Sequence, residues 1–194
     1  MLLKAVNNSI NKGIKMKIIA FGASSSRKSI NKQLATYAAN LAAATQKNST
    51  VEILDLNDFE LPLFSQDKEE ELGQPEAAKA FYKKLGESDA IIISFAEHNG
   101  SYTAAYKNLF DWASRINQKV FQNKSMLLLA TSPGPGGAGS VLTAAAGSAF
   151  YFAGDVKATL SIPSFFDNFD MENAKLNNEE LQLQLQDAVN RLFS

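Results

Sequence analysis

Short apolar runs alternate with longer amphipathic stretches over most of this 194-residue chain, and this alternation limits the folds open to it. Apolar runs of strand length occupy residues 17–21, 50–56, 90–95, 125–131 and 156–161. Helical spacing of apolar residues and capping signals predict helices over residues 31–45, 75–87, 103–115 and 138–152, and from about 177 onward. Strands that alternate with helices are typical of βαβ units, so the sequence predicts a parallel sheet covered by helices.

The number and order of these elements predict one α/β domain over residues 16–194. Five strands with intervening helices fit the flavodoxin-like arrangement, a three-layer sandwich in which a five-stranded parallel sheet of order 2-1-3-4-5 has helices on both faces. No linker or internal repeat divides the chain. Residues 1–15 precede the first strand, and we expect them to be a disordered extension or a segment that does not belong to the native protein.

Charge and composition disfavour several classes of function. The net charge is −1 and no run of basic residues occurs, which argues against nucleic acid or an anionic membrane as a partner. The chain has no cysteine, so disulfides, thiol catalysis and thiolate metal sites are excluded. No apolar stretch approaches the ~18 residues of a membrane-spanning helix, and the first residues lack a signal-peptide pattern. We therefore expect a cytoplasmic protein.

Three loops that follow predicted strands carry the most informative polar residues and glycines. They read GASSSRKSIN over 22–31, AEHNGSYT over 96–103 and TSPGPGGAGS over 131–140. Strands one, three and four are neighbours in the predicted order, so these loops converge at the carboxyl edge of the sheet, where open α/β sheets bind ligands. Serines at a helix N-terminus favour a phosphate, an Asn-Gly turn exposes backbone polar groups, and glycines permit close approach. Together the loops predict a mononucleotide site, with a flavin as the leading candidate.

Each loop taken alone also has an ordinary structural interpretation. Serine and asparagine are common helix N-caps, and Asn-Gly is a common turn. No P-loop, dinucleotide fingerprint or G-x-S-x-G nucleophile elbow is present. His98 is the only histidine, and we expect it to form part of a pocket wall rather than to act as a general acid or base. Asp55, at the end of the second strand, is expected to cap a turn.

The segment AEHNGSYTAAYKNLFDWASR, residues 96–115, resembles a motif of the NAD(P)H-dependent FMN reductase family. It is similar to that family's P-E-Y-N-G-S loop and to the K-N-x-x-D-W helix that follows, and the wider resemblance covers residues 17–161. Ala96 stands where proline is frequent in the family, and His98 stands where tyrosine is frequent. These two departures bear on ring stacking and on substrate preference.

The resemblance implies an FMN site at the three loops and a homodimer, with a homotetramer as the alternative. In the homodimer, the helix over 103–115 would offer the aromatic residues Tyr106, Phe110 and Trp112 as candidate contacts, and packing in the core explains some of them equally well. The residues implied at the FMN site fall into three groups. Ser24, Ser26, Ser29, Ile30 and Asn31 would hold the phosphate; Glu97, His98, Asn99 and Gly100 would line the isoalloxazine; and Ser132, Gly134, Gly136 and Gly137 would approach the ring and ribityl chain from the other side.

The function that the resemblance implies is that of an NAD(P)H-dependent oxidoreductase. NADPH or NADH would pass hydride to FMN, and a small-molecule acceptor such as a quinone, an azo compound or free flavin would receive the electrons. The flavin carries this chemistry, so no catalytic side chain and no metal site is expected. The alternative is a flavodoxin-like FMN electron carrier without nicotinamide turnover, although such carriers are usually strongly acidic. A hydrolase or a non-enzymatic module on the same fold is a third interpretation, because fold does not fix function.

Overall fold

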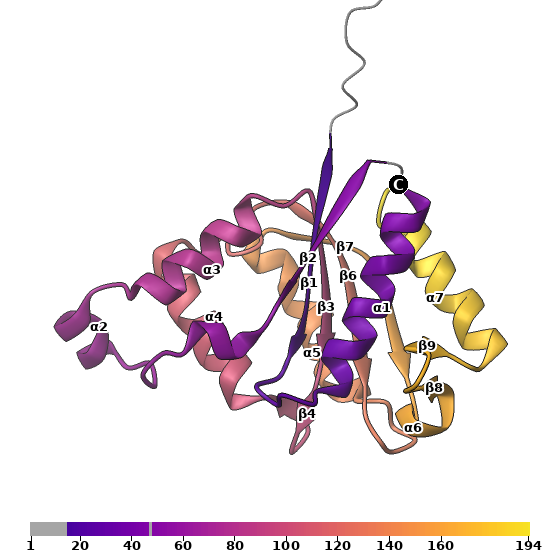
Figure 1. Ribbon diagram of the computed structural model, residues 1–194. Coiled ribbons are helices and arrows are strands. Elements are labelled where there is room, and N and C mark those ends of the chain that lie inside the picture. Colours follow the sequence, from indigo (N-terminus) through magenta and orange to yellow (C-terminus); the bar gives the residue numbers. More distant parts are fainter. Residues whose placement is uncertain (1–14, 47) are drawn as a thin grey trace, which may run out of the picture.

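A parallel sheet of five strands forms the centre of the computed structural model, which describes residues 15–46 and 48–194 (Figure 1). The strands are β1 (Met16–Ala23), β2 (Ser49–Leu54), β3 (Ala90–Phe95), β6 (Lys124–Thr131) and β7 (Gly154–Ile162). They lie in the order β2-β1-β3-β6-β7, and each neighbouring pair is parallel. This is the order 2-1-3-4-5, so the predicted flavodoxin-like fold is confirmed. Apart from Lys15, the predicted N-terminal extension lies outside the described residues.

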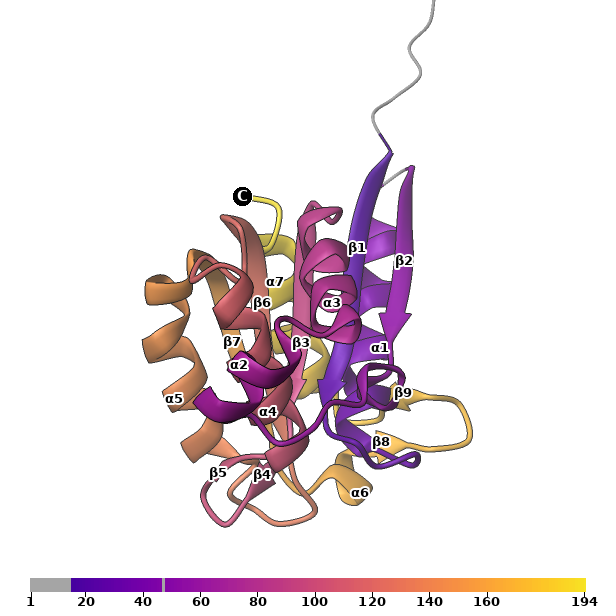
Figure 2. The same ribbon diagram turned by 90° about the vertical axis from the view of Figure 1, so that its left-hand side faces the viewer.

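Helices cover both faces of this sheet, because successive side chains of each buried strand point to opposite sides. One face carries α1 (Ile30–Thr45) and α7 (Glu179–Arg191), and the other carries α3 (Glu76–Gly86), α4 (Ala104–Ile116) and α5 (Gly139–Ala149) (Figure 1, Figure 2). In β1, Ile18 and Ala20 join the apolar cluster of α1 and α7. Ile19 and Phe21 join the cluster of α3, α4 and α5. The core therefore has two layers separated by the sheet.

The end of β2 differs from the prediction, because Asp55 stops the strand. Its side chain accepts a hydrogen bond from the Asn57 amide at 2.9 Å and starts the 3-10 helix η1 (Leu56–Phe59), which confirms the expected turn cap. The other carboxylate oxygen lies 2.5 Å from the ammonium of Lys32 in α1. The hydrogen bonds from Lys32 and from Asn57 lower the pKa of Asp55 from its ordinary value.

Several helix boundaries also differ from the prediction by one residue or more. Pro75 is the N-cap of α3 rather than its first residue. The N-cap of α7 is Asn178, whose side chain accepts from the Leu181 amide at 3.1 Å, so the helix begins at Glu179 rather than near 177. The helix predicted over 138–152 is divided into α5 and the 3-10 helix η2 (Phe150–Phe152). Among the helices of the described ranges, none combines the length and apolar character needed to cross a membrane.

The long connection between η1 and α3 contains a helix that the sequence did not predict, α2 (Gln66–Leu72), and α4 anchors this connection. The indole Nε1 of Trp112 donates to the carbonyl oxygen of Pro62 at 2.8 Å. Trp112 is fully buried and Tyr106 is 4% exposed, while Phe110 is half-buried. Two of the three aromatic side chains expected at a dimer contact therefore lie in the core.

Two short hairpins and the short helix α6 lie near the carboxyl edge of the sheet, at the bottom of Figure 1. One hairpin consists of β4 (Glu97–His98) and β5 (Ser101–Tyr102), and it follows β3 directly. The short helix α6 (Phe165–Asn168) follows β7, and a second hairpin of β8 (Phe169–Asp170) and β9 (Lys175–Leu176) comes after it. The three loops identified in the sequence end at this same edge.

Candidate functional site

The loop between β1 and α1 presents free donors at a helix N-terminus. Ser29 caps α1, because its hydroxyl accepts from the Lys32 amide at 3.2 Å. The amides of Ile30 and Asn31, the first two of the helix, make no hydrogen bond with any described residue. No acidic residue occupies the first turn, so nothing there neutralises the positive end of the helix dipole. This end of α1 is therefore suited to an anion.

The side chain of Asn31 connects the start of α1 to two strands. Its Nδ2 donates to the carbonyl oxygen of Thr131 at 3.0 Å, and its Oδ1 accepts from the Thr131 amide at 3.1 Å. The same oxygen accepts from the Ser94 hydroxyl at 2.7 Å. Asn31 is 2% exposed, so this network is buried. The carboxamide holds the protein together at this edge, and the backbone N–H is the part of Asn31 that is free for a ligand.

The second loop forms the tight hairpin of β4 and β5. Asn99 and Gly100 form its two-residue turn, with φ of 52° and 76°. Positive φ at both central positions is the requirement of a type I′ turn, which explains the Asn-Gly pair. The turn predicted from this dipeptide is confirmed. His98, Asn99 and Gly100 are exposed, so the hairpin presents polar backbone and one imidazole to the outside.

Glu97 links this hairpin to the N-terminus of α5. Its Oε2 accepts from the Val141 amide, in the first turn of α5, at 2.8 Å. The N-cap residue of α5 is Ala138, whose side chain cannot accept a hydrogen bond. The Glu97 carboxylate, from the hairpin, provides the missing acceptor. A carboxylate is favourable at this position because the helix dipole attracts negative charge.

Replacing Glu97 by alanine is expected to lower the free energy of unfolding by about 1–2 kcal/mol, because the Val141 amide loses its partner at a helix end. Urea denaturation followed by far-UV circular dichroism measures this loss. Glu97→Gln is the matched control, since its amide oxygen keeps the acceptor, and it should lose less than Glu97→Ala. Equal stability of Glu97→Ala and the unchanged protein would contradict the capping role.

The third loop bends back onto the end of β7 and the segment that follows it. The carbonyl oxygen of Gly134 accepts from the Ser164 amide at 2.9 Å, and that of Gly137 accepts from the Ser161 hydroxyl at 2.8 Å. A Cβ at Gly137 would lie 2.2 Å from the Ser161 hydroxyl oxygen, so this glycine permits a close contact inside the protein. The packing of the loop explains part of its glycine content without a ligand.

A hollow of about 230 Å³ brings parts of all three loops together at the carboxyl edge. The residues from the sequence-based site that line it are Ser24, Ser26, Ser29, Ile30, Asn31, Glu97, His98 and Ser132. The others, Asn99, Gly100, Gly134, Gly136 and Gly137, lie in the same loops but are not among its lining residues.

Five residues that line the hollow were not among the sequence-based site residues, namely Lys28, Ala96, Thr131, Pro133 and Phe166. Lys28 and Phe166 add the most to its chemistry. Lys28 belongs to the serine-rich loop, and it forms no ion pair within the described ranges. Its position next to Ser29, at the start of a predicted helix, could have indicated a phosphate contact. Phe166 lies in α6 and is 59% exposed, directly after the fully buried Phe165. Two consecutive phenylalanines after the last strand of the sheet, at the edge where the loops meet, could have indicated an aromatic side chain at the site.

The hollow therefore has two chemically different parts. Lys28, the serine hydroxyls and the free amides of α1 surround one part, which favours a phosphate. Glu97 and His98 of β4 and the ring of Phe166 also line the hollow, and an apolar ring beside polar groups suits a flat ligand with polar edges. In the described part of the chain, no group of three or more carboxylate or imidazole side chains is placed to hold a metal ion.

A comparison with protein families gives a match over residues 16–166 to the family described as NADPH-dependent FMN reductase. Among curated proteins, the chain is 36% identical over 120 residues to a 2-hydroxy-1,4-benzoquinone reductase from a Burkholderia species, covering 61% of this chain and 62% of the relative. It is 30% identical over 122 residues to an NADPH:quinone oxidoreductase of Arabidopsis thaliana, covering 63% and 61%. The similarity thus spans about three fifths of these relatives.

Solved structures show the same fold over nearly the whole chain. A flavoenzyme NAD(P)H:(acceptor) oxidoreductase from Paracoccus denitrificans superposes with a TM-score of 0.70 at 22% identity, covering 92% of this chain and 95% of the other. An FMN-dependent NADH-azoreductase from Bacillus anthracis, solved in complex with FMN, gives a TM-score of 0.61 at 11% identity, covering 92% and 100%. At these identities the likeness concerns the fold.

Proposed function

This chain belongs to the NADPH-dependent FMN reductase family, and we propose that it binds FMN and uses NADPH or NADH to reduce a small-molecule acceptor. The observation that carries the proposal is the hollow at the carboxyl edge, where the free N-terminus of α1 faces the hairpin after β3. Quinones are the first acceptor class to consider, because several relatives are named quinone reductases. Azo compounds and free flavin are the other candidates.

The phosphate of FMN would lie at the start of α1. The amides of Ile30 and Asn31 would donate to its oxygens, and the hydroxyls of Ser24, Ser26 and Ser29 lie around the same space. Lys28 would add a positive charge. Lys32 is close by in sequence, but its ammonium is held by Asp55, so we assign it no phosphate contact.

The ring would lie against the hairpin of β4 and β5. His98, Asn99 and Gly100 would present backbone groups to its polar edge, and Ser132 would approach from the third loop. Glu97 would act as a positioning residue, since its carboxylate is bound to α5. Gly134, Gly136 and Gly137 lie in the same third loop outside the lining of the hollow, and they remain proposed contacts of the ring and ribityl chain.

In this proposal the protein orients two ligands and supplies no nucleophile. FMN, when bound, accepts hydride from the nicotinamide and passes electrons to the acceptor. The residues listed above would fix the flavin, while the N–H groups of the hairpin would favour negative charge on its polar edge. Phe166 would offer an apolar surface next to the ring and limit access of water.

The assembly and location that we propose are a homodimer and the cytoplasm. Large apolar side chains that dimerisation would cover stand next to α5, where Phe150 is 82% exposed and Tyr151 is 70% exposed. Half-buried Phe110 of α4 is a further candidate contact. Sedimentation velocity distinguishes a monomer, a dimer and a tetramer, and cell fractionation tests the location.

Removal of the Lys28 charge tests the phosphate half of the site. Lys28→Ala is expected to weaken FMN binding by about threefold to tenfold at low salt, because one charge-assisted contact to the phosphate is lost. Riboflavin has the same ring without a phosphate, so its affinity should not change. Fluorescence titration of both flavins, with Lys119→Ala as a surface-lysine control, gives the comparison. Equal weakening of FMN and riboflavin would contradict the assigned position of the phosphate.

A further inference from the structure

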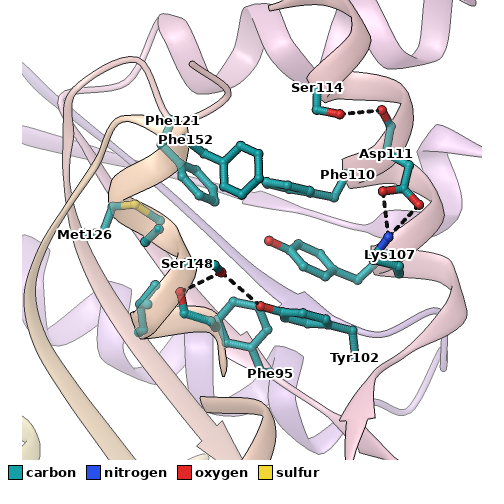
Figure 3. A pocket seen from close by; sticks show the side chains of 14 residues that line it. Phe95, Tyr102, Lys107, Phe110, Asp111, Ser114, Phe121, Met126, Ser148 and Phe152 are labelled. Atoms are coloured by element: carbon teal, nitrogen blue, oxygen red, sulfur yellow. Dashed lines mark hydrogen bonds and ion pairs between the residues drawn. The ribbon is translucent and has the colours of Figure 1, made fainter. Parts of the chain in front are cut away.

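A second cavity of about 240 Å³, with six aromatic side chains among its 14 lining residues, lies between α4 and α5, against the sheet (Figure 3). Its labelled lining in Figure 3 includes Tyr102 from β5, Phe110 from α4, and Phe121 and Phe152. The cavity shares no lining residue with the hollow at the carboxyl edge. It is therefore a separate space, located inside the layer of helices rather than at the loops.

Tyr106 brings an unpartnered donor to this cavity. The residue lines the cavity and is 4% exposed, yet its hydroxyl makes no hydrogen bond with any described residue. Burial raises the pKa of Tyr106 well above its ordinary value, with a smaller effect of Tyr102, so the hydroxyl keeps its proton at neutral pH. Among the described residues, no fully buried side-chain oxygen or nitrogen lacks a partner, so the Tyr106 hydroxyl faces the open space of the cavity, where a ligand that carries an acceptor can take its hydrogen bond.

The polar side of the lining carries charges that already neutralise one another. Lys107 and Asp111, four apart on α4, lie there as an ion pair with Nζ–O distances of 2.7 and 2.8 Å. Both side chains are partly exposed, so they mark the side that is open to solvent. A charged ligand would have to compete with this pair, whereas a neutral ligand would not.

We propose that this cavity binds a neutral, planar aromatic compound of about two fused rings, with one hydrogen-bond acceptor that faces the Tyr106 hydroxyl. The size follows from the volume: an apolar protein cavity of about 150 Å³ holds one benzene, and the present cavity of about 240 Å³ is larger. The flat shape follows from the rings that line the space, since aromatic pairs prefer offset-stacked or edge-to-face contacts. The proposal does not depend on FMN binding.

The methyl group of Met126 gives a direct readout, because this side chain lines the cavity, whereas Met171 is exposed in the turn between β8 and β9. Protein with ¹³C-labelled methionine methyls, loaded with FMN, is titrated with 1-indanone, a bicyclic ketone, and separately with indane, which lacks the carbonyl. We expect a saturable shift of the Met126 signal with both compounds and no shift of Met171.

Two variants separate the hydrogen bond from the space. Tyr106→Phe keeps the ring and removes a hydroxyl that has no protein partner, so it should fold. The variant is expected to lower the affinity for 1-indanone about fivefold, as for the loss of one neutral hydrogen bond, and to leave the affinity for indane unchanged. Ser148→Leu adds bulk to the lining and should reduce the affinity of both compounds.

Three outcomes would overturn the proposal. One is the absence of a Met126 shift at saturating concentrations of both compounds. Another is an equal effect of Tyr106→Phe on 1-indanone and indane, which would leave the hydroxyl without a role. The third is a Met126 chemical shift that changes with protein concentration and not with probe concentration. If sedimentation velocity on the same samples shows self-association over that concentration range, a second copy of the chain fills the cavity.

Discussion

Replacing Gly22 by alanine is expected to destabilise the protein by roughly 3 kcal/mol or more, the largest loss among single changes near the site. A Cβ at Gly22 would lie 2.4 Å from the backbone nitrogen of Lys32 and 2.8 Å from its Cα. These are backbone atoms in the first turn of α1, so the clash is relieved only by moving the helix away from β1. The same movement would displace the amides of Ile30 and Asn31, and FMN affinity should fall together with stability.

Urea denaturation of Gly22→Ala, combined with FMN titration, measures both effects. Gly147→Ala is the matched control, because Gly147 lies in α5, is exposed and has open space around its Cβ position. The control should be neutral or more stable by up to about 1 kcal/mol, as for glycine to alanine in a helix. A Gly22→Ala protein with the stability and FMN affinity of the unchanged chain would contradict the close approach of α1 to β1.

Replacing Asn31 by alanine is expected to cost about 3 kcal/mol, because three buried hydrogen bonds are lost together. The amide and carbonyl of Thr131 and the hydroxyl of Ser94 would remain without these partners in a region that Asn31 now closes. Asn40→Ala is the matched control on the same helix, since Asn40 is exposed. It should leave stability within about 0.5 kcal/mol of the unchanged chain.

Denaturation and FMN titration of Asn31→Ala also decide between two roles for this residue. A large loss of stability would show that the Asn31 carboxamide acts structurally, by joining α1 to β3 and β6 through hydrogen bonds. A protein of unchanged stability that binds FMN much more weakly would instead place the Asn31 carboxamide on the phosphate. The sequence resemblance alone does not distinguish the two roles, since both need asparagine at the start of α1.

Much of the fold could be predicted because the relevant signals are local. The isoleucine run of β3 and the spacing of apolar residues in α1 identify these elements without knowledge of the rest. The positive φ of Asn99 and Gly100 was also foreseeable, because few residue pairs tolerate that turn. The strand order followed from the alternation of elements and the known preferences of open sheets.

The missed features depend on residues far apart in the sequence. Glu97 forms a hydrogen bond with Val141, and Asn31 forms hydrogen bonds with Ser94 and Thr131. These residues are far apart in the sequence, so no local pattern predicts the contacts. The third loop was assigned to the ligand because glycine permits close approach, but at Gly137 the close neighbour is Ser161 of the protein itself. The cavity beside Tyr106 likewise arises from how α4 and α5 pack on the sheet.

The most direct test of the central claim is anaerobic addition of NADPH, and separately of NADH, to the purified protein reconstituted with FMN. The absorbance of the oxidised flavin band is followed after each addition. We expect rapid loss of this band with at least one of the two nicotinamides, and its return when a quinone is added. Bound FMN that keeps its colour with both nicotinamides would contradict the proposed activity and favour an electron carrier, and a folded protein that binds no FMN would contradict the site itself.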